Sequence, residues 1–456
     1  MKEYPKIHPR FSEAVRFVES LEGRGWRLGL DRMMAFAEAC GVSDSLGIGE
    51  SSPKFIHVAG TNGKGSVTAM VQSILTQAGF RTGGFFSPYV VTILERIQLN
   101  NRNIGQTDFV EAVEALSPIV RQFDDHEMGA VTEFEFKTAM GLHVWKKNNC
   151  DWVALEVGLG GRLDATNIVT PRASVITSIG LDHMALLGDN VKAIAAEKGG
   201  IIKPGIPTVI GNCPDGSDEV LRHIAREQNS ELWQLGQDIH FQAGETLKIQ
   251  TPGRSYELRY GELKGGVQNQ NTAVAVVALE QAGLNLPDET ISEGLANVSI
   301  PGRFQQFPWR GRTMIMDGAH NVDSARALRE RLELLNPNRV VLLTSMLQGH
   351  DPDDFYAELA GQFDVAIATV IDFHRAMPLD VISGSLRKFC PQVEEMPSQK
   401  DAYVRAFSQA KEGDVILVTG SFYLVGAIMR MYYKELEATV QSPHEADHES
   451  PDEPVQ

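Results

Sequence analysis

Cysteine is scarce in this chain. Cys40, Cys150, Cys213 and Cys390 lie far apart and form neither a CxxC pair nor a Cys/His spacing that binds zinc, so we expect no disulfide framework and no zinc site. The chain also has no run of about 18 apolar residues, and its charged N-terminal segment lacks the apolar centre of a signal peptide. We therefore expect a reduced, cytoplasmic and soluble protein that does not bind membranes.

Positive charge is also in short supply. The 456 residues carry a formal net charge of −17 at pH 7, and no basic block stands out. A surface of this sign repels phosphate backbones, which argues against a nucleic-acid partner. The length exceeds what one hydrophobic core usually supports, so two domains are expected. We expect small-molecule substrates and a monomer.

The most informative segment of the chain is an apolar strand that runs into a glycine-rich turn. The strand is predicted over Phe55–Ala59, and Gly60, Gly63, Lys64 and Gly65 follow it. Apolar residues then recur at helical spacing from Val67 to Ala78. Such a turn cradles phosphate with backbone amides, one lysine and a helix N-terminus. It departs from the standard P-loop at Val58 and Gly65, and a glycine-rich turn without a ligand is the alternative.

The pattern of apolar runs indicates an α/β protein with a mostly parallel sheet in its first domain and a second, smaller Rossmann-like α/β domain. Alternating residues between 238 and 262 suggest a small antiparallel addition. Pro301 and Gly302 break the chain between the domains, which we place at 1–298 and 302–438. The acidic, proline-containing tail at 440–456 has too little apolar content to fold. Strands are predicted at 55–59, 84–86, 152–157, 174–179, 208–210, 313–316, 340–344, 365–370 and 415–419.

Three polar residues follow predicted parallel strands of the first domain. They are Ser87, Glu156 and His183. Ligands of open parallel sheets bind beyond the carboxyl ends of the strands. A hydroxyl, a carboxylate and an imidazole near a triphosphate suit Mg²⁺. Taken singly, each residue could equally be an ordinary turn or strand-end residue.

Several segments together resemble the folylpolyglutamate synthase/dihydrofolate synthase family of the Mur ligase superfamily. The resemblance extends from about residue 25 to 430 in family order. The segments that carry it are 60–66, 87–89, 155–167, 180–183, 197–201, 301–304, 317–321, 374–376 and 419–426. The resemblance implies an ATP-dependent ligase that joins L-glutamate to a folate-type carboxylate through an acyl phosphate. It also implies a first domain that binds ATP and folate and a second domain of the Mur ligase C-terminal type.

The resemblance assigns a role to each matching residue. ATP would contact Thr61, Asn62, Gly63, Lys64, Gly65, Ser66, Asn271, Arg303 and Asp317. One or two Mg²⁺ ions would be held by Ser87, Glu156, His183 and a carbamylated Lys198, and the catalytic residues would be Lys64, Lys198 and His320. Glutamate would bind near His320 and Ser421. The folate or pteroate pocket would be lined by Gly29, Leu30, Asp31, Thr132, Glu133, Phe134, Glu135, Leu163, Asp164 and Ala165. For Phe134, ordinary core packing is an equal alternative.

Four departures from the family pattern affect substrate selectivity more than ligase chemistry. They are Tyr89 for a common His, Val267 for His, Val322 for Pro, and Gly349-His350-Asp351 for Asp-Lys-Asp. Three other functions stay open: a Mur-type ligase for another carboxylate such as a UDP-linked muropeptide precursor, a P-loop switch protein, and a ligase relative that has lost activity. The sequence does not decide between dihydropteroate and folylpolyglutamate acceptors.

Overall fold

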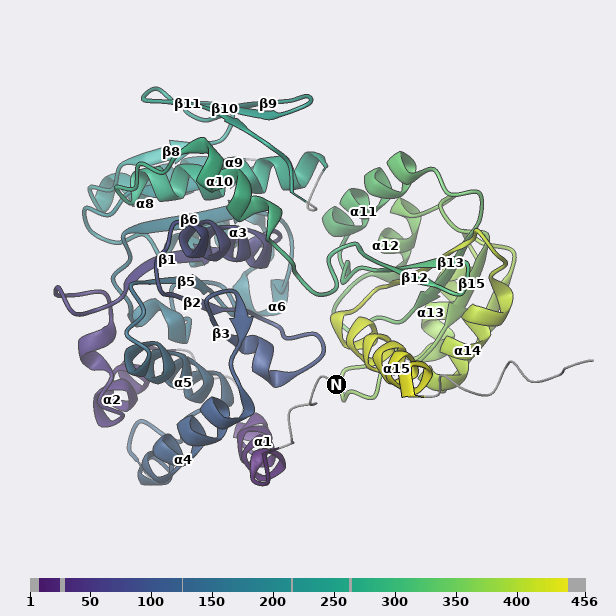
Figure 1. Cartoon of the computed structure of the whole chain (residues 1–456), viewed down its shortest axis with the longest axis horizontal. Coiled ribbons are helices and arrows are strands. Elements are labelled where there is room, and N and C mark those ends of the chain that lie inside the picture. Colours follow the sequence, from purple (N-terminus) through teal and green to yellow (C-terminus); the bar gives the residue numbers. More distant parts are fainter. Residues whose placement is uncertain (1–7, 25–28, 125, 215, 262–264, 442–456) are drawn as a thin grey trace, which may run out of the picture. The chain divides into compact units, whose positions relative to one another are not determined.

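The structure, a computed structural model, describes residues 8–24, 29–124, 126–214, 216–261 and 265–441. The chain divides into two units, Met1–Ile300 and Pro301–Gln456 (Figure 1). From position 442 onward, the acidic tail predicted at 440–456 lies outside the described residues. None of the described helices is long and apolar enough to cross a membrane.

The first unit is built on an eight-stranded sheet with the order β4-β3-β2-β5-β1-β6-β7-β8. The six strands from β2 to β8 in this order run parallel, whereas β3 and β4 pair antiparallel at one edge. The predicted mostly parallel sheet is therefore confirmed, although β3, β4 and β8 were not predicted. The bounds are β1 Lys54–Ala59, β2 Thr82–Phe85, β3 Ile97–Leu99, β4 Arg102–Asn103, β5 Trp152–Glu156, β6 Ala173–Ser178, β7 Thr208–Asn212 and β8 Leu232–Gln234.

Helices cover both faces of this sheet because neighbouring residues of a buried strand point to opposite sides. In β1, Phe55 packs with residues of α1, α2, α4 and α5, while Ile56 and Val58 pack with residues of α3, α9 and α10. Residues of α7 and α8 pack against β6 and β7. The bounds are α1 Phe11–Glu19, α2 Asp31–Ala39, α3 Lys64–Gln77, α4 Gln106–Gln122, α5 Glu133–Lys147, α6 Met184–Leu187, α7 Val191–Gly199, α8 Ser217–Glu227, α9 Gly266–Gln281 and α10 Asp288–Ala296.

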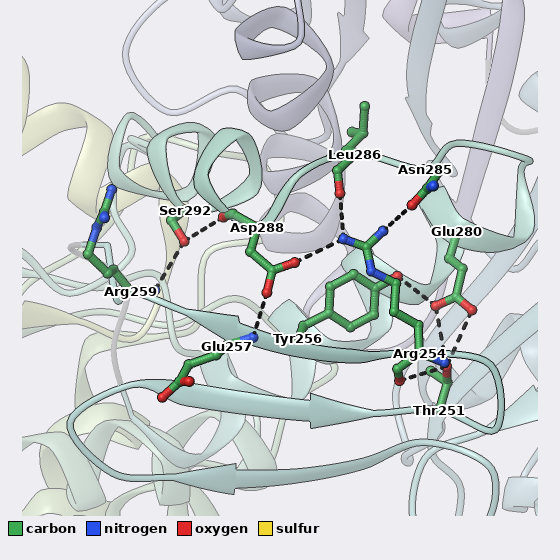
Figure 2. A network of polar contacts seen from close by, with 10 residues as sticks. All are labelled: Thr251, Arg254, Tyr256, Glu257, Arg259, Glu280, Asn285, Leu286, Asp288 and Ser292. Carbon is green, nitrogen blue, oxygen red and sulfur yellow. Dashed lines mark hydrogen bonds and ion pairs between the residues drawn. The ribbon is translucent and has the colours of Figure 1, made fainter.

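A separate antiparallel sheet lies beyond α9 and α10 at the top of Figure 1. Its strands are β9 His240–Ala243, β10 Leu247–Gln250 and β11 Ser255–Leu258, which confirms the predicted addition. Polar contacts fasten the sheet to the helices (Figure 2). The Arg254 guanidinium lies 4.3 Å over the Tyr256 ring and donates to Asp288 at 2.9 Å, while the Tyr256 hydroxyl donates to Glu280 at 2.7 Å.

The second unit contains a six-stranded sheet with the order β12-β13-β17-β14-β15-β16. All neighbouring pairs are parallel except β12 with β13, so the predicted second α/β domain is confirmed. Its strands are β12 Gln305–Trp309, β13 Arg312–Met316, β14 Val340–Thr344, β15 Val365–Ala368, β16 Val393–Glu395 and β17 Val415–Thr419. Its helices are α11 Val322–Leu335, α12 Pro352–Glu358, α13 Leu379–Leu386, α14 Gln399–Gln409 and α15 Phe422–Gln441.

Candidate active site

The glycine-rich turn joins the central strand β1 to α3, and two of its glycines are required by their surroundings. Gly60 has φ +149°, and a Cβ there would lie 1.9 Å from Thr177 Oγ1. Gly63 has φ +86°, and a Cβ there would lie 2.6 Å from Asn271 Oδ1. Both positions combine a backbone conformation that favours glycine with a close neighbour. The glycines therefore let β6 and α9 approach the turn, and Asn271 is brought to it.

Hydrogen bonds from the end of β6 hold the turn in place. The Thr61 amide donates to the Ser178 carbonyl at 2.8 Å, and the Asn62 amide donates to Ser178 Oγ at 3.0 Å. Thr177 Oγ1 donates to the Asn62 carbonyl at 2.6 Å. The turn is therefore preorganised by the neighbouring strand, as a phosphate-binding loop needs to be.

Two lysines meet at one carbonyl of the turn. Lys64 Nζ and Lys198 Nζ donate to the Gly60 carbonyl at 2.9 and 3.0 Å. Burial, together with the smaller effect of the neighbouring charge of Lys64, lowers the pKa of Lys198 to about 7, although Asp182 and Asp164 oppose the shift. At neutral pH a substantial share of Lys198 is therefore the uncharged amine.

Glu156, one of the predicted metal ligands, lies beside the turn. It is the last residue of β5, and its carboxylate accepts a 2.8 Å hydrogen bond from the Ser87 amide. Its two oxygens lie 3.7 Å from the point where a Cβ on Gly65 would stand. A standard P-loop carries a Ser or Thr at this position to reach Mg²⁺. In this chain Gly65 provides no hydroxyl, and the Glu156 carboxylate, with the adjacent Ser87, lies next to the space that the hydroxyl would fill.

His183 is placed differently from Glu156. It precedes α6 with φ +50°, its amide donates to Asp182 Oδ1 at 2.8 Å, and its side chain is 41% exposed. Among the described residues no group of three or more His, Cys, Asp or Glu side chains could hold a metal ion. The predicted ligand set contains only two residues of these types, because its other members are a serine and a lysine. A divalent ion held by this predicted set would therefore need further oxygen donors.

The segments predicted to line the acceptor pocket meet through an ion pair. Gly29, Leu30 and Asp31 lie at the start of α2, and the segment 132–135 begins α5. Glu135 accepts from the guanidinium of Arg32 at 3.0 Å and from the Thr132 amide at 2.8 Å. Both side chains of the ion pair are buried. This capping arrangement fixes the starts of the two helices relative to each other.

Phe134 connects α5 to the loop after β5, and Asp164 lies within that loop. A Cβ on Gly158 would lie 2.3 Å from Phe134 Cζ, so the Phe134 ring lies directly against that glycine. The Phe134 ring also meets the Phe85 ring edge-on at 5.9 Å. Asp164 is buried and directly precedes the short helix η4 (Ala165–Ile168). Burial raises the pKa of Asp164, and the hydrogen bonds that its carboxylate accepts oppose this.

The remaining predicted residues lie in the second unit. The Asp317 carboxylate accepts from the amides of Phe304 at 2.7 Å and Ala319 at 2.8 Å. Burial raises the pKa of Asp317, and the nearby Arg303 opposes the shift. The Arg303 guanidinium lies 4.5 Å over the ring of Phe422. These contacts bring together Asp317 and Arg303, which were predicted to bind nucleotide.

His320 and Ser421, predicted to lie near glutamate, also belong to this unit. His320 Nδ1 lies 2.7 Å from the Gly318 carbonyl, so Nδ1 carries the proton in that contact. The His320 ring stands 5.1 Å from that of His350 and 5.9 Å from that of Phe422. Ser421 Oγ is buried and accepts from the Tyr423 amide at 3.1 Å.

Comparison with known proteins shows the family of the chain. Residues 58–279 match the Mur ligase middle domain, and residues 302–422 match the glutamate ligase domain of Mur ligases. The dihydrofolate synthase/folylpolyglutamate synthase of Bacillus subtilis is 34% identical over 406 residues, covering 84% of this chain and 92% of the relative. The chain belongs to the folylpolyglutamate synthase/dihydrofolate synthase family of Mur ligases.

Solved structures of this family share the fold over nearly the whole chain. Escherichia coli FolC in complex with DHPP and ADP has a TM-score of 0.83 at 29% identity and covers 95% of this chain and 100% of its own. A bifunctional folylpolyglutamate synthase/dihydrofolate synthase with Mn, AMPPNP and L-glutamate bound has a TM-score of 0.81 at 29% identity and covers 94% of this chain and 99% of its own. The α/β fold class, the family resemblance and the class of ATP-dependent ligase are thus confirmed. The folate function is favoured over a Mur-type ligase for another acceptor.

The structure also shows site neighbours that the family resemblance did not single out. Thr177 and Ser178, which anchor the turn, could have been found as polar residues at the end of an apolar strand. Lys137 lies one helical turn after Glu133, pairs with its carboxylate and is only 4% exposed. Its Nζ lies 5.4 Å from the centre of the Tyr89 ring. A lysine four residues after a glutamate on a helix is normally solvent-exposed, so the sequence does not predict that Lys137 is buried.

Proposed function

We infer that this protein is an ATP-dependent ligase that joins L-glutamate to a folate-type carboxylate, either dihydropteroate, a tetrahydrofolate that already carries glutamate, or both. Family membership supports the reaction, and so do the relatives solved with ADP and DHPP or with AMPPNP, Mn and L-glutamate. The observation that carries the proposal is the meeting of Lys64, Lys198 and Glu156 around one preorganised glycine-rich turn.

The reaction needs activation of the acceptor, because a carboxylate has no good leaving group. Transfer of the ATP γ-phosphate to the acceptor carboxylate forms an acyl phosphate and releases ADP. The glutamate amine, once it has lost its proton, attacks the acyl carbon, an amide forms and phosphate leaves. Lys64 and the amides of the turn would neutralise charge on the phosphates during the first step. Asn271 and Ser66 would support the nucleotide from α9 and α3.

Ser87, Glu156 and His183 are the residues that would hold Mg²⁺. The fit is supported by the Glu156 carboxylate, which stands where Gly65 leaves room beside the turn. When bound, the ion would offset negative charge on the phosphate oxygens. Glu156 would act by presenting oxygen donors, while the Ser87 amide keeps that carboxylate oriented.

Lys198 is suited to carbamylation, which replaces its positive charge by a carboxylate that can donate oxygen to a metal ion. Its pKa of about 7 leaves neutral amine available, and that amine can attack CO₂ to give a carbamate with release of one proton. The change would replace a cation next to Lys64 by an anion, which removes a repulsion. We propose that this carbamate supplies the oxygen donors that unmodified side chains of the site lack.

The proposed function is tested with purified protein, ATP, Mg²⁺ and L-glutamate. Dihydropteroate, which carries no glutamate, and tetrahydrofolate, which carries one, are supplied in separate reactions, and phosphate release is followed together with product mass. We expect phosphate release that depends on both glutamate and acceptor, with a product heavier by one glutamate residue. A UDP-linked muropeptide precursor serves as the contrasting acceptor. Turnover with that precursor and with no folate would overturn the folate assignment.

A further inference from the structure

His57 is a fully buried histidine in the central strand β1, and it lies outside the set of residues predicted to contact a substrate. Its side chain shares a face of the sheet with Phe55 and points to the loop that follows β5. His57 Nε2 lies 2.9 Å from Thr166 Oγ1, which belongs to the short helix η4 and is also fully buried. A polar contact between two buried groups of this kind needs a reason beyond filling space.

The contacts of Thr166 determine which ring nitrogen of His57 carries the proton. Thr166 Oγ1 donates its only hydrogen to Asp164 Oδ1 at 2.5 Å, so it must accept from the imidazole. The proton of the neutral ring is therefore on Nε2. Nδ1 is then an acceptor, and the described residues offer it no hydrogen-bond partner. Burial, with a smaller effect from Lys203, lowers the pKa of His57 to about 3, so the ring stays neutral at physiological pH.

The hydrogen bonds continue from Thr166 to the loop that carries Leu163, Asp164 and Ala165. Asp164 Oδ1 also accepts from the Thr166 amide at 2.9 Å, and Asp164 Oδ2 accepts from the Leu159 amide at 2.9 Å. Asp164 thus joins both ends of its own loop, and His57 ties the loop to the strand that leads into the phosphate-binding turn. The orientation of the Asp164 carboxylate depends on the Thr166 hydroxyl, whose own orientation depends on His57.

We propose that His57 is a positioning residue for the acceptor side of the site: its Nε2–H orients the Thr166 hydroxyl, which in turn holds Asp164 and the loop 158–167 in the shape that receives the acceptor. The proposal rests on the folate-ligase function inferred above. An apolar side chain at position 57 would avoid burying an acceptor without a partner, as Nδ1 is buried here. The positioning role explains why a histidine is found at this position nevertheless.

A matched pair of substitutions tests which ring nitrogen matters. The amide nitrogen of glutamine can take the place of Nε2, whereas that of asparagine takes the place of Nδ1. We expect His57→Gln to keep the acceptor KM within about twofold of the wild type, and His57→Asn to raise it about tenfold, as expected for one lost hydrogen bond. In both variants the ATP KM should change by less than about twofold, which a general loss of structure would not produce.

Thr166→Val removes the hydroxyl while keeping the side-chain shape, and Thr166→Ser keeps the hydroxyl. We expect Thr166→Val to raise the acceptor KM as His57→Asn does. The double variant His57→Asn/Thr166→Val should have the same acceptor KM as Thr166→Val alone. Additive effects, or equal increases in the KM of ATP and acceptor, would overturn the positioning role. A wild type that turns over no folate acceptor would overturn the ligase function itself, so the two failures are distinguishable.

A spectroscopic measurement keeps the test independent of whether His57→Asn folds. Ring ¹⁵N spectra of the histidine-labelled wild type should show one neutral Nε2–H tautomer that does not titrate between pH 5 and 9, assigned by its loss in His57→Gln. Thr166→Val should shift this resonance, and Thr166→Ser should restore it. A His57 ring that titrates near its ordinary pKa, or is protonated on Nδ1, would contradict the proposal.

Discussion

The Ser87 amide donates a 2.8 Å hydrogen bond to the carboxylate of Glu156. The two residues follow or end β2 and β5, which are adjacent parallel strands, so the contact forms at the carboxyl edge of the sheet. This hydrogen bond from a backbone amide does not require a negative charge on the side chain at position 156. The orientation of the side chain and its charge can therefore be separated by mutation.

Glu156→Gln should fold like the wild type and lose most ligase turnover. The glutamine carbonyl can still accept from the Ser87 amide, but the side chain no longer carries the negative charge that a divalent ion needs. Loss of one preorganised charge contact in such chemistry reduces kcat by about 10²-fold or more. Phosphate release at saturating ATP and Mg²⁺, together with the melting temperature, checks the prediction. A near wild-type rate would show that Glu156 is not a metal ligand.

Lys64→Ala should reduce turnover to a similar extent, because it removes the charge that we propose neutralises the ATP phosphates. Lys192→Ala is the control, since Lys192 is an exposed lysine of α7. We expect the control to keep its rate and the Lys64 variant to lose about 10²-fold in kcat/KM. Equal rates in the two variants would mean that the turn does not hold the phosphates.

Lys198 should be carbamylated in protein prepared with bicarbonate, and the carbamylated fraction should increase as pH rises through about 7. The sign follows from the lowered pKa of Lys198: above it the amine is neutral and can attack CO₂, and below it the ammonium cannot. ¹³C spectra with labelled bicarbonate detect the adduct.

Lys198→Ala should lose turnover and recover part of it with added short carboxylates. Lys192→Ala again serves as the control from the same helix. An unmodified Lys198 at pH 8 together with a fully active alanine variant would contradict the assignment of this residue to the metal site.

Gly158→Ala should raise the acceptor KM more than the ATP KM. The added methyl group would lie 2.3 Å from Phe134 Cζ, so the ring must move away from the loop. Gly23→Ala is the control, because a Cβ there has no neighbour within 4 Å. We expect the control to keep both KM values and its melting temperature. An unchanged acceptor KM in Gly158→Ala would show that the Phe134 ring lies outside the acceptor pocket.

Lys137 should make the free energy of unfolding increase with pH between about 8 and 10.5. Burial first, and then the charge of Arg96, lower the pKa of Lys137 from 10.5 to about 8 in the folded protein. In this window the unfolded chain binds more protons than the folded one, so raising the pH favours folding. Denaturant unfolding of the wild type and Lys137→Met at several pH values should show a smaller increase in the variant, where only other buried lysines such as Lys198 still contribute.

Lys147→Met is the control for that measurement. Lys147 lies on the same helix, but a hydrogen bond to Glu111 raises its pKa instead. The control should keep the increase between pH 8 and 10.5. A smaller increase in both variants would mean that the increase comes from the net charge of the helix and not from the burial of Lys137.

Features with a local physical signal could be predicted from the sequence. The strands β1, β5, β6 and β7 are apolar runs, and Gly79, a residue type that favours helix ends, has φ +88° just beyond α3. The short strands β3 and β4, with three and two residues, lack enough length for a recognisable period. In the second unit β15 ends at Ala368 and not at Val370.

The partners of site residues were harder to predict than the residues themselves. The turn and Glu156 stand at strand ends, where the sequence indicates chemistry. The hydrogen bonds of β1 and of the turn come from distant segments, such as Ser178 beside Asn62 and Thr166 beside His57. Their sequence separations of 116 and 109 residues leave no local pattern. Only the sheet order, which sets β5 and β6 on either side of β1, brings these segments together.

The same separations affect when a newly made chain can first hold nucleotide. The phosphate-binding turn is synthesised early, but Ser178 follows Asn62 by 116 residues and Lys198 follows Gly60 by 138. Loops of this length close only after the chain between them is available. A chain still on the ribosome therefore contains the glycine-rich sequence long before it contains the groups that shape it. Nucleotide can stabilise the shaped turn only after the chain has been made to at least Lys198, so ATP cannot assist the early steps of folding of the first unit.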